Sequence, residues 1–305
     1  MFDLGIVIVS WNVADLLKRC LASVFSQQGD LKFHVIVVDN ASQDGSADLV
    51  QSDFPEVELI RSEKNLGYST ANNWGLKSLG FDGDSLPRSR YVLLLNPDTE
   101  LPPQALSEMV AYLTERPEVG AAGPKLILPD GSLDLACRRS FPSPSVSFWH
   151  FTRLAKWFPK SRRLGQYNMT YIDPDQDIEV DSVVGAFMLV RSEVIESVGL
   201  LDERFFMYGE DLDWAFRIKQ AGWQIRYNPA VVVQHVKRAS SSQSQRARQE
   251  FYIAMHLFYL KHYRKQTATW LHFLIMFGIL LQGGIGLWLA PGWKKTKTIL
   301  QSPNR

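Results

Sequence analysis

The chain has 305 residues, with 33 Lys and Arg against 32 Asp and Glu, a hydrophobic share of 46% and an aromatic share of 12%. This length suits one large α/β domain with an appendage, or two small domains, and the near-zero net charge provides no global field for binding nucleic acid. Cys20 and Cys137 are the only cysteines, which excludes a disulfide framework or a thiolate metal site and fits a reducing cytosol. The first residues, MFDLGIVIVS, lack a basic leader, so we expect a strand there rather than a signal peptide.

The first part of the chain alternates short apolar runs with helical patterns. We expect strands at residues 5–10, 33–40, 57–60, 91–98 and 118–128. Apolar residues at helical spacing predict a helix over residues 13–25. This alternation is typical of βαβ units and therefore of a mainly parallel, buried sheet. Since such sheets bind ligands beyond the carboxyl ends of their strands, the rule points to Asp39 and Asp98, which each close an apolar strand.

The second part of the chain is less regular. Residues 138–176 are rich in Pro, Ser, Arg and aromatic residues, which predicts a long surface excursion. We expect a strand at residues 180–191, a helix from Glu210 to Gly222, a short VVV strand before His235, and an amphipathic helix at residues 251–263.

The carboxyl-terminal part differs from the rest, because no residue between Lys265 and Lys294 is charged. Residues 270–290 are almost continuously apolar, and about 20 such residues span a bilayer as a helix. Cations on both sides, with Trp270 and Trp288 near the ends, fit an interfacial arrangement. We therefore expect a folded domain over residues 1–265 and a hydrophobic membrane-associating tail over residues 266–305, either spanning or in plane; a buried or dimer-forming helix pair is the alternative.

Acidic residues at strand ends carry the first chemical signals. Asp39, in DNASQDGS, either accepts a hydrogen bond from a pyrimidine N–H or only caps a turn. Asp98, in LLLNPDTE, is held by Pro97 and is suited to Mg²⁺ or Mn²⁺, which neutralises a diphosphate; the alternative is an Asx turn. His235 also stands at a strand end and becomes a second metal ligand if it lies beside Asp98, rather than an ordinary structural histidine.

The segment FFMYGEDLDWAFR places Glu210, Asp211 and Asp213 in the first turn of a helix. Acids there complement the helix dipole and contribute about 0.3–1 kcal/mol each, which accounts for Glu210 and Asp213. Asp211 follows a ring-rich approach that restricts water, so it also suits a base that deprotonates a sugar hydroxyl.

Taken together, these segments resemble the inverting glycosyltransferases of family 2, and most closely the rhamnosyltransferase-like branch that builds bacterial cell-surface polysaccharides. The resemblance covers about residues 4–263. It is carried by DNASQDGS, NLGYSTANNWGL, LLLNPDTEL, VVGAFMLVR and VGLLDERFFMYGEDLDWAFRIKQAGWQIRYNP. It implies a GT-A fold, in which a Rossmann-like, mainly parallel sheet flanked by helices binds the nucleotide and is joined to an acceptor-binding half.

The resemblance also implies a role for individual residues. Asp39 would recognise the pyrimidine, Ser10 would lie against the nucleoside, and Asn65, Gly67 and Asn72 would form a loop near the nucleotide. Asp98 and His235 would bind Mg²⁺ or Mn²⁺, Asp211 would be the general base with Glu210 beside it, and Gly185-Ala186 would form a turn near the acceptor. The family's metal motif has an acid at both outer positions, whereas this chain has Asn96 at the first.

The implied reaction is a single inverting displacement that moves a sugar from a nucleoside diphosphate, with deoxythymidine-diphosphate rhamnose as the first candidate, to a glycan or lipid-linked acceptor. The expected location is the cytoplasmic face of a bacterial plasma membrane, with no nucleic acid as partner. The basic stretches Arg138-Arg139, Arg162-Arg163 and 237–248 would hold a lipid diphosphate acceptor or close over the donor, or else be solvated loops.

Two other functions remain as alternatives. A sugar-phosphate nucleotidyltransferase would need a Gly-rich basic loop after the first strand, where this chain has SWNVADLL. A dehydrogenase would need G-x-G-x-x-G in the same place, and that motif is missing from the sequence. Besides the nucleotidyltransferase, the second remaining alternative is a membrane-tethered glycan-binding or scaffold protein without catalysis.

Overall fold

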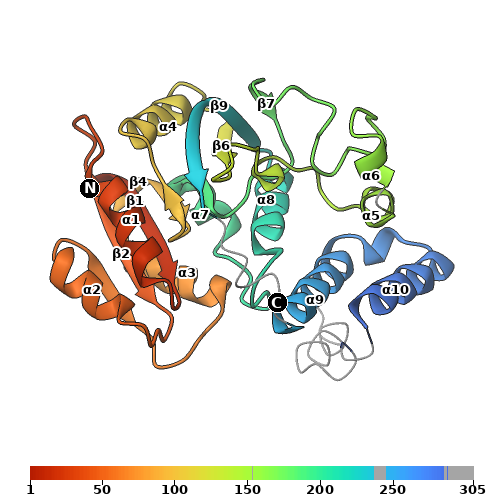
Figure 1. Ribbon diagram of the computed structural model, residues 1–305, viewed down its shortest axis with the longest axis horizontal. Coiled ribbons are helices and arrows are strands. Elements are labelled where there is room, and N and C mark those ends of the chain that lie inside the picture. The colour runs from red at the N-terminus through yellow and green to blue at the C-terminus, as the bar shows by residue number, and fades with distance from the viewer. Residues whose placement is uncertain (153, 237–244, 285–286, 288–305) are drawn as a thin grey trace.

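One mixed β-sheet with helices on both faces forms the centre of the molecule (Figure 1). The computed structural model describes residues 1–152, 154–236, 245–284 and 287. The strands are β1 (Phe2–Ser10), β2 (Phe33–Asp39), β3 (Glu58–Arg61), β4 (Ser89–Leu95), β5 (Thr99–Glu100), β6 (Val119–Ile127), β7 (Ile178–Glu179), β8 (Phe187–Arg191) and β9 (Gln224–His235). Their order across the sheet is β3-β2-β1-β4-β8-β6-β9-β5, and β7 pairs with β9.

The amino-terminal half of the sheet is parallel, as the sequence predicts. β1 pairs in parallel with β2 and β4, and β2 pairs in parallel with β3. The apolar runs that predict these strands are buried along most of their length. Because the strands are parallel, their carboxyl ends meet at one edge of the sheet, where the register places Ser10 opposite Asp39. The end of β4 at Leu95 delivers the segment with Asp98 to the same edge.

The other half is mixed, because β8 runs antiparallel to both β4 and β6, while β6 and β9 are parallel. The strand predicted over residues 180–191 is shorter than expected: β8 begins at Phe187, and Gly185 lies in the preceding turn. β9 is longer than the predicted VVV strand. Its pairing with β6 shifts register between Asn228 and Val232, so Pro229, which has no N–H to donate, lies outside this ladder.

Helices complete the layers around the sheet. They are α1 (Ala14–Phe25), α2 (Ser46–Asp53), α3 (Tyr68–Ser78), α4 (Ala105–Thr114), α5 (Pro144–Phe151), α6 (Leu154–Trp157), α7 (Ser192–Val198), α8 (Glu210–Gln220), α9 (Gln245–His262) and α10 (Thr269–Gly283), with short 3-10 helices η1 (Leu135–Cys137) and η2 (Arg264–Gln266). α3 packs on β1 and β2, and α8 packs on β6 and β9. These two helices begin beside the carboxyl edge of the strands and bring their first residues toward it.

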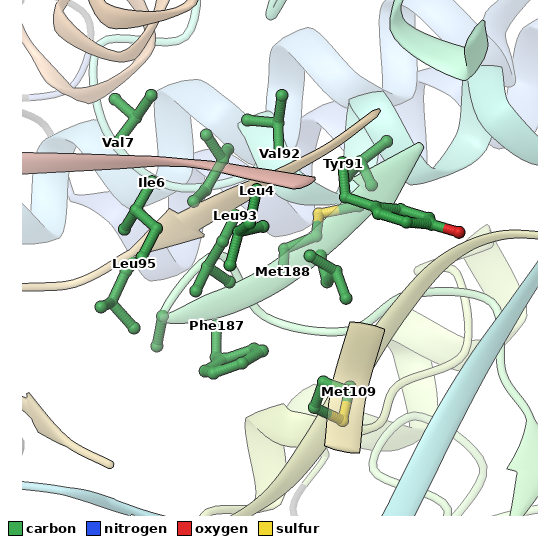
Figure 2. Close-up of a cluster of buried hydrophobic side chains, with 14 of the residues drawn as sticks. Leu4, Ile6, Val7, Tyr91, Val92, Leu93, Leu95, Met109, Phe187 and Met188 are labelled. Atoms are coloured by element: carbon green, nitrogen blue, oxygen red, sulfur yellow. The ribbon is translucent and has the colours of Figure 1, made fainter. Parts of the chain in front are cut away.

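Figure 2 shows the centre of the core, where side chains from neighbouring strands meet. Ile6 of β1, Leu93 of β4 and Met188 of β8 are buried, and Met109 of α4 lies toward the same cluster. These strands are therefore fixed by packing on both faces, which gives the sheet edge a rigid base.

The carboxyl-terminal helices pack side by side at one end of the molecule (Figure 1). α9 packs against the first turn of α8 through an apolar cluster that includes Phe205, Leu212 and Phe258. α10 packs on α9 through Ile279, which meets Ile253 in a second cluster. Within the described residues, no helix has both the length and the apolar character needed to cross a bilayer. The remainder of the predicted tail, residues 285–286 and 288–305, lies outside the described part of the chain.

Candidate active site

Two buried polar side chains with unmet hydrogen bonds stand at the edge where β1 and β2 end. Ser10 is 0% exposed and Asp39 is 3% exposed. Asp39 Oδ2 accepts a hydrogen bond from the Ser42 N–H at 3.0 Å. Within the described residues, neither Asp39 Oδ1 nor Ser10 Oγ has a hydrogen-bond partner. Leaving a buried acceptor unsatisfied costs about 1–3 kcal/mol, so this pair fits a ligand that supplies a donor.

The loop before α3 is shaped by asparagine side chains. Asn65 Oδ1 accepts hydrogen bonds from the Asn40 amide at 3.1 Å and from the Gly67 N–H at 2.9 Å. Gly67 has φ +83°, and a Cβ there would come within 2.5 Å of the Phe206 carbonyl, so the turn requires glycine. Asn72 donates to the Tyr68 carbonyl at 2.9 Å within α3. The described contacts of Asn65 and Asn72 therefore hold the loop and the helix in place.

Asp98 and His235 lie side by side, as the sequence predicts. His235 Nε2 is 3.3 Å from Asp98 Oδ1, because β5 and β9 pair Thr99 with His235. On its other face, His235 Nδ1 is 2.8 Å from Asp134 Oδ2. Burial alone would lower the pKa of His235, but hydrogen bonds to Asp134 and Asp98 outweigh it and raise the pKa to about 9.

This pair fits a divalent cation that also binds the substrate. A carboxylate that orients the far nitrogen of a histidine is the usual support of a histidine metal ligand, and Asp134 occupies that position. The described residues contain no cluster of three or more His, Cys, Asp or Glu able to hold a metal by themselves. Mg²⁺ commonly takes one or two protein carboxylates and completes its shell with substrate phosphates and water. Asn96 does not join the pair, since its Oδ1 faces the Tyr68 hydroxyl at 3.2 Å.

The first turn of α8 contains three buried acids, and two of them, Glu210 and Asp211, belong to this site. Gly209, with φ +78°, redirects the chain into the helix. Asp211 is 6% exposed, and its Oδ2 accepts from Arg139 Nη2 at 2.6 Å and from the Gly185 N–H at 3.1 Å. Glu210 is 7% exposed, and its Oε2 has no hydrogen-bond partner in the part of the chain that the structure describes. Burial, and then the charge of Asp211, raise the pKa of Glu210 to about 8.

Tyr68 connects the strand edge to this helix. Its hydroxyl lies 3.2 Å from Asn96 Oδ1 and 2.9 Å from the Gly185 carbonyl, and Gly185 in turn donates to Asp211. Burial raises the pKa of Tyr68, followed by the charges of Glu210 and Asp211. A continuous chain of contacts therefore runs from Asn96, directly after β4, through Tyr68 and Gly185 to Asp211.

Sequence reasoning missed three residues of this site: Tyr68, Asp134 and Arg139. Tyr68 lies in a quoted motif, but nothing in the sequence reveals its contact with Gly185. The alternative of a solvated loop is wrong for Arg138 and Arg139, because both side chains are buried. Arg138 donates to the carbonyls of Ile172 and Asp173, both at 2.7 Å.

A family model described as "Glycosyl transferase family 2" matches residues 5–199. A Mycobacterium tuberculosis protein named N-acetylglucosaminyl-diphospho-decaprenol L-rhamnosyltransferase is 32% identical over 241 residues, which cover 78% of this chain and 77% of the relative. A Haloferax volcanii protein named low-salt glycan biosynthesis hexosyltransferase Agl10 is 27% identical over 72% of this chain and 62% of its own length.

Among solved structures, GalNAc-T7 with UDP, GalNAc and Mn²⁺ superposes with a TM-score of 0.58 at 15% identity. The match covers 85% of this chain and 48% of the GalNAc-T7 chain. At this identity the likeness concerns the fold alone, and it agrees with the α/β architecture described above.

Proposed function

The chain belongs to glycosyl transferase family 2, and we propose that it catalyses a single inverting transfer of a sugar from a nucleoside diphosphate to a hydroxyl of a glycan or lipid-linked acceptor. The observation that carries this proposal is the pair of unsatisfied buried atoms, Asp39 Oδ1 and Ser10 Oγ. They lie at the same sheet edge that leads to Asp98, and the contacts of Tyr68 connect this edge to Asp211.

On the donor side, Asp39 Oδ1 accepts the ring N–H of a pyrimidine, and Ser10 Oγ lies against the nucleoside. Asp98 and His235 would hold Mg²⁺ or Mn²⁺, with Asp134 orienting the histidine ring. When bound, such an ion neutralises negative charge on the diphosphate. Asn65 and Gly67 act on the donor indirectly by shaping the adjoining loop, and Asn72 supports the start of α3.

On the acceptor side, Asp211 accepts the proton of the attacking hydroxyl. The hydroxyl oxygen forms a bond to the anomeric carbon while the bond from that carbon to the diphosphate oxygen breaks, and its electron pair leaves with the nucleoside diphosphate. One displacement without an enzyme-bound sugar inverts the anomeric configuration. Glu210 lies next to Asp211 with a buried oxygen that has no partner among the described residues, and it positions the acceptor or the base.

The proposed substrates are taken from the name of the M. tuberculosis relative. The name of the M. tuberculosis protein specifies an L-rhamnosyl transfer to N-acetylglucosaminyl-diphospho-decaprenol. We propose the same chemical classes here: an activated deoxyhexose such as deoxythymidine-diphosphate rhamnose, and a saccharide linked through diphosphate to a polyprenol. Cell-surface polysaccharide synthesis is the process that such a product enters.

A lipid-linked acceptor requires a membrane, and α10 provides a means of attachment at the cytoplasmic face of a bacterial plasma membrane. Its exposed apolar side chains share one face, and they are Trp270, Phe273, Leu274, Phe277 and Leu281. At about 1.5 Å per residue, a helix of this length falls short of the ~30 Å hydrocarbon core. An in-plane position therefore suits α10, with Arg264 and Lys265 of η2 near the headgroups.

Vesicle flotation tests this attachment. Serine at Trp270, Phe273 and Phe277 together should reduce flotation with anionic vesicles, whereas Leu86→Ser, at an exposed leucine elsewhere on the surface, should leave it unchanged. Equal flotation of both variants and the wild type would contradict the assignment of α10.

The function itself is tested by measuring nucleoside diphosphate release from a panel of nucleotide sugars in the presence of Mg²⁺ or Mn²⁺ and a polyprenyl-diphosphate saccharide. Acceptor-dependent release is expected. Binding of glycan without turnover of any donor would favour a non-catalytic binding protein, and formation of a nucleoside triphosphate from pyrophosphate and a sugar nucleotide would favour a nucleotidyltransferase.

A further inference from the structure

Arg139 is held in a fixed place beside the acid pair. The backbone N–H of Arg139 donates to the Ser182 carbonyl at 2.9 Å, and the backbone N–H of Ser182 donates to the Arg139 carbonyl at 3.0 Å. This bridge anchors the main chain next to the turn that contains Gly185. The Arg139 side chain is buried, so its guanidinium cannot serve as a solvated surface charge and must be matched by local partners.

Those partners place the guanidinium on one oxygen of Asp211. Arg139 Nη2 donates to Asp211 Oδ2 at 2.6 Å and faces the Val183 carbonyl at 3.1 Å. The Gly185 N–H approaches the same Oδ2 at 3.1 Å. Two donors from different segments thus converge on a single carboxylate oxygen. Charge-assisted hydrogen bonds of this length are strong and directional, so they fix the rotation of the carboxylate.

The positive charge of Arg139 also acts on the pKa of the neighbouring Glu210. Burial and the charge of Asp211 raise the pKa of Glu210, while Arg139 acts in the opposite direction, and Asp213 adds a further negative charge. Burial opposes the charge on Arg139, but the attraction of Asp211 and Tyr167 raises the pKa of Arg139 above its ordinary value. The guanidinium is therefore a permanent positive charge that pairs with Asp211, and Glu210 Oε2 stays without a partner in the described part of the chain.

We propose that Arg139 is a positioning residue for the proton-accepting carboxylate, holding Asp211 Oδ2 together with the Gly185 N–H in the direction that the acceptor hydroxyl requires. The proposal rests on the proposed function, since the orientation of Asp211 matters only if Asp211 is the base. A purely structural ion pair would affect the stability of the fold and nothing else. The neighbouring Arg138 has a purely structural role, because its buried guanidinium donates to the backbone carbonyls of Ile172 and Asp173.

The experiment compares Arg139→Gln with Arg138→Gln in steady-state assays of nucleoside diphosphate release across pH 5 to 9. For Arg139→Gln, a displaced base predicts a loss of about 10²-fold in kcat, with the donor KM nearly unchanged. The acidic limb of its kcat/KM profile should move to higher pH, because Arg139 lowers the pKa of Glu210 and its loss removes that effect. Arg138→Gln should lower the melting temperature while leaving kcat and the pH profile in place.

Wild-type kcat in Arg139→Gln, an unmoved acidic limb, or a parallel loss of donor affinity would each overturn the proposal. If Arg139→Gln does not fold, Arg139→Lys is the deciding variant, because lysine keeps the charge but lacks the planar guanidinium. We expect Arg139→Lys to have a lower kcat and an acidic limb at the wild-type pH. A wild-type kcat in Arg139→Lys would overturn the proposal. A wild-type protein that turns over no donor would overturn the proposed function instead, whereas an active wild type matched by Arg139→Gln would overturn only the role of Arg139.

Discussion

Asp39→Asn is a sharp perturbation of the proposed donor site, because the two carboxylate oxygens of Asp39 lie in different surroundings. Oδ2 accepts from the Ser42 N–H at 3.0 Å and holds the turn, while Oδ1 is buried without a partner in the described part of the chain. An asparagine can keep its oxygen on the Ser42 N–H, so the turn should survive. Its amide nitrogen then replaces Oδ1 and directs a donor at the place where an acceptor is needed.

The magnitude follows from this exchange. A hydrogen bond between a charged group and a neutral one contributes about 1.5–3 kcal/mol, and each 1.4 kcal/mol corresponds to about tenfold in affinity. Losing the bond between Asp39 Oδ1 and a pyrimidine N–H should therefore weaken nucleotide binding by about 10- to 150-fold. The melting temperature should change little, since the side-chain hydrogen bond from the Ser42 N–H, which holds the turn, is retained.

Isothermal titration calorimetry with deoxythymidine and uridine diphosphates measures this change directly, with thermal melting run in parallel. Asp44→Asn is the matched control, because Asp44 is a carboxylate of the same loop. Its two oxygens already accept hydrogen bonds from the Ala14 N–H, the Ser46 N–H and the Ser46 hydroxyl. The nucleotide affinity of Asp44→Asn should equal that of the wild type. An unchanged Kd in Asp39→Asn, or an equal loss in both variants, would refute the reasoning about Oδ1.

Three further variants test the rest of the site. Asp211→Asn should lower kcat by about 10²- to 10⁴-fold with donor affinity retained; a fully active variant removes Asp211 from the role of base. Asp98→Ala should weaken calorimetric binding of both Mn²⁺ and the nucleoside diphosphate, and unchanged affinities would count against the metal assignment. Asp213, which is 0% exposed, accepts from Arg217, Lys261 and His262, so Asp213→Ala should cost about 3–5 kcal/mol in urea unfolding. Burial would raise the pKa of Asp213, but the His262 hydrogen bond and the charges of Lys261 and Arg217 lower it. The contribution of Asp213 to the stability of the fold is therefore present above the ordinary pKa of an aspartate and is lost as the pH falls. The Asp213→Ala variant should lack this acid-sensitive contribution. Equal acid sensitivity of variant and wild type would contradict that assignment.

The family resemblance implies that Asp98 and His235 share a site, and apolar runs place each of them at or near the end of a strand. The antiparallel pairing of β5 with β9, which the sequence does not reveal, brings the two residues within 3.3 Å. The register of β1 and β2 places Ser10, which the resemblance assigns to the nucleoside, level with Asp39. These positions follow from periodicity and from the family resemblance, whereas the catalytic and binding roles of the residues stay predictions.

Long-range contacts could not be predicted. Arg139 lies in a stretch rich in Pro, Ser and Arg, and its partner Asp211 is 72 positions away, so composition suggests exposure where the fold provides burial. The antiparallel insertion of β8 is equally hidden, since an apolar strand does not reveal its direction. The length of β9 was missed because Asn228 and Pro229 interrupt its apolar pattern.

The helix α8 illustrates both outcomes. Its start at Glu210 and its end near Gly222 follow from glycine positions and apolar spacing. The different surroundings of its acids do not: Asp211 pairs with Arg139, Asp213 joins α9 through Lys261, and Glu210 keeps a free oxygen. Three carboxylates that look alike in the sequence thus have three separate environments in the fold.

The anomeric configuration of the product tests the central claim most directly. With a nucleoside-diphosphate sugar and a polyprenyl-diphosphate saccharide as substrates, NMR of the isolated product should show a glycosidic bond opposite in configuration to the donor, formed by the wild type and strongly reduced in Asp211→Asn. A product that retains the donor configuration, or no product from any donor, would contradict a single displacement at this edge of the sheet.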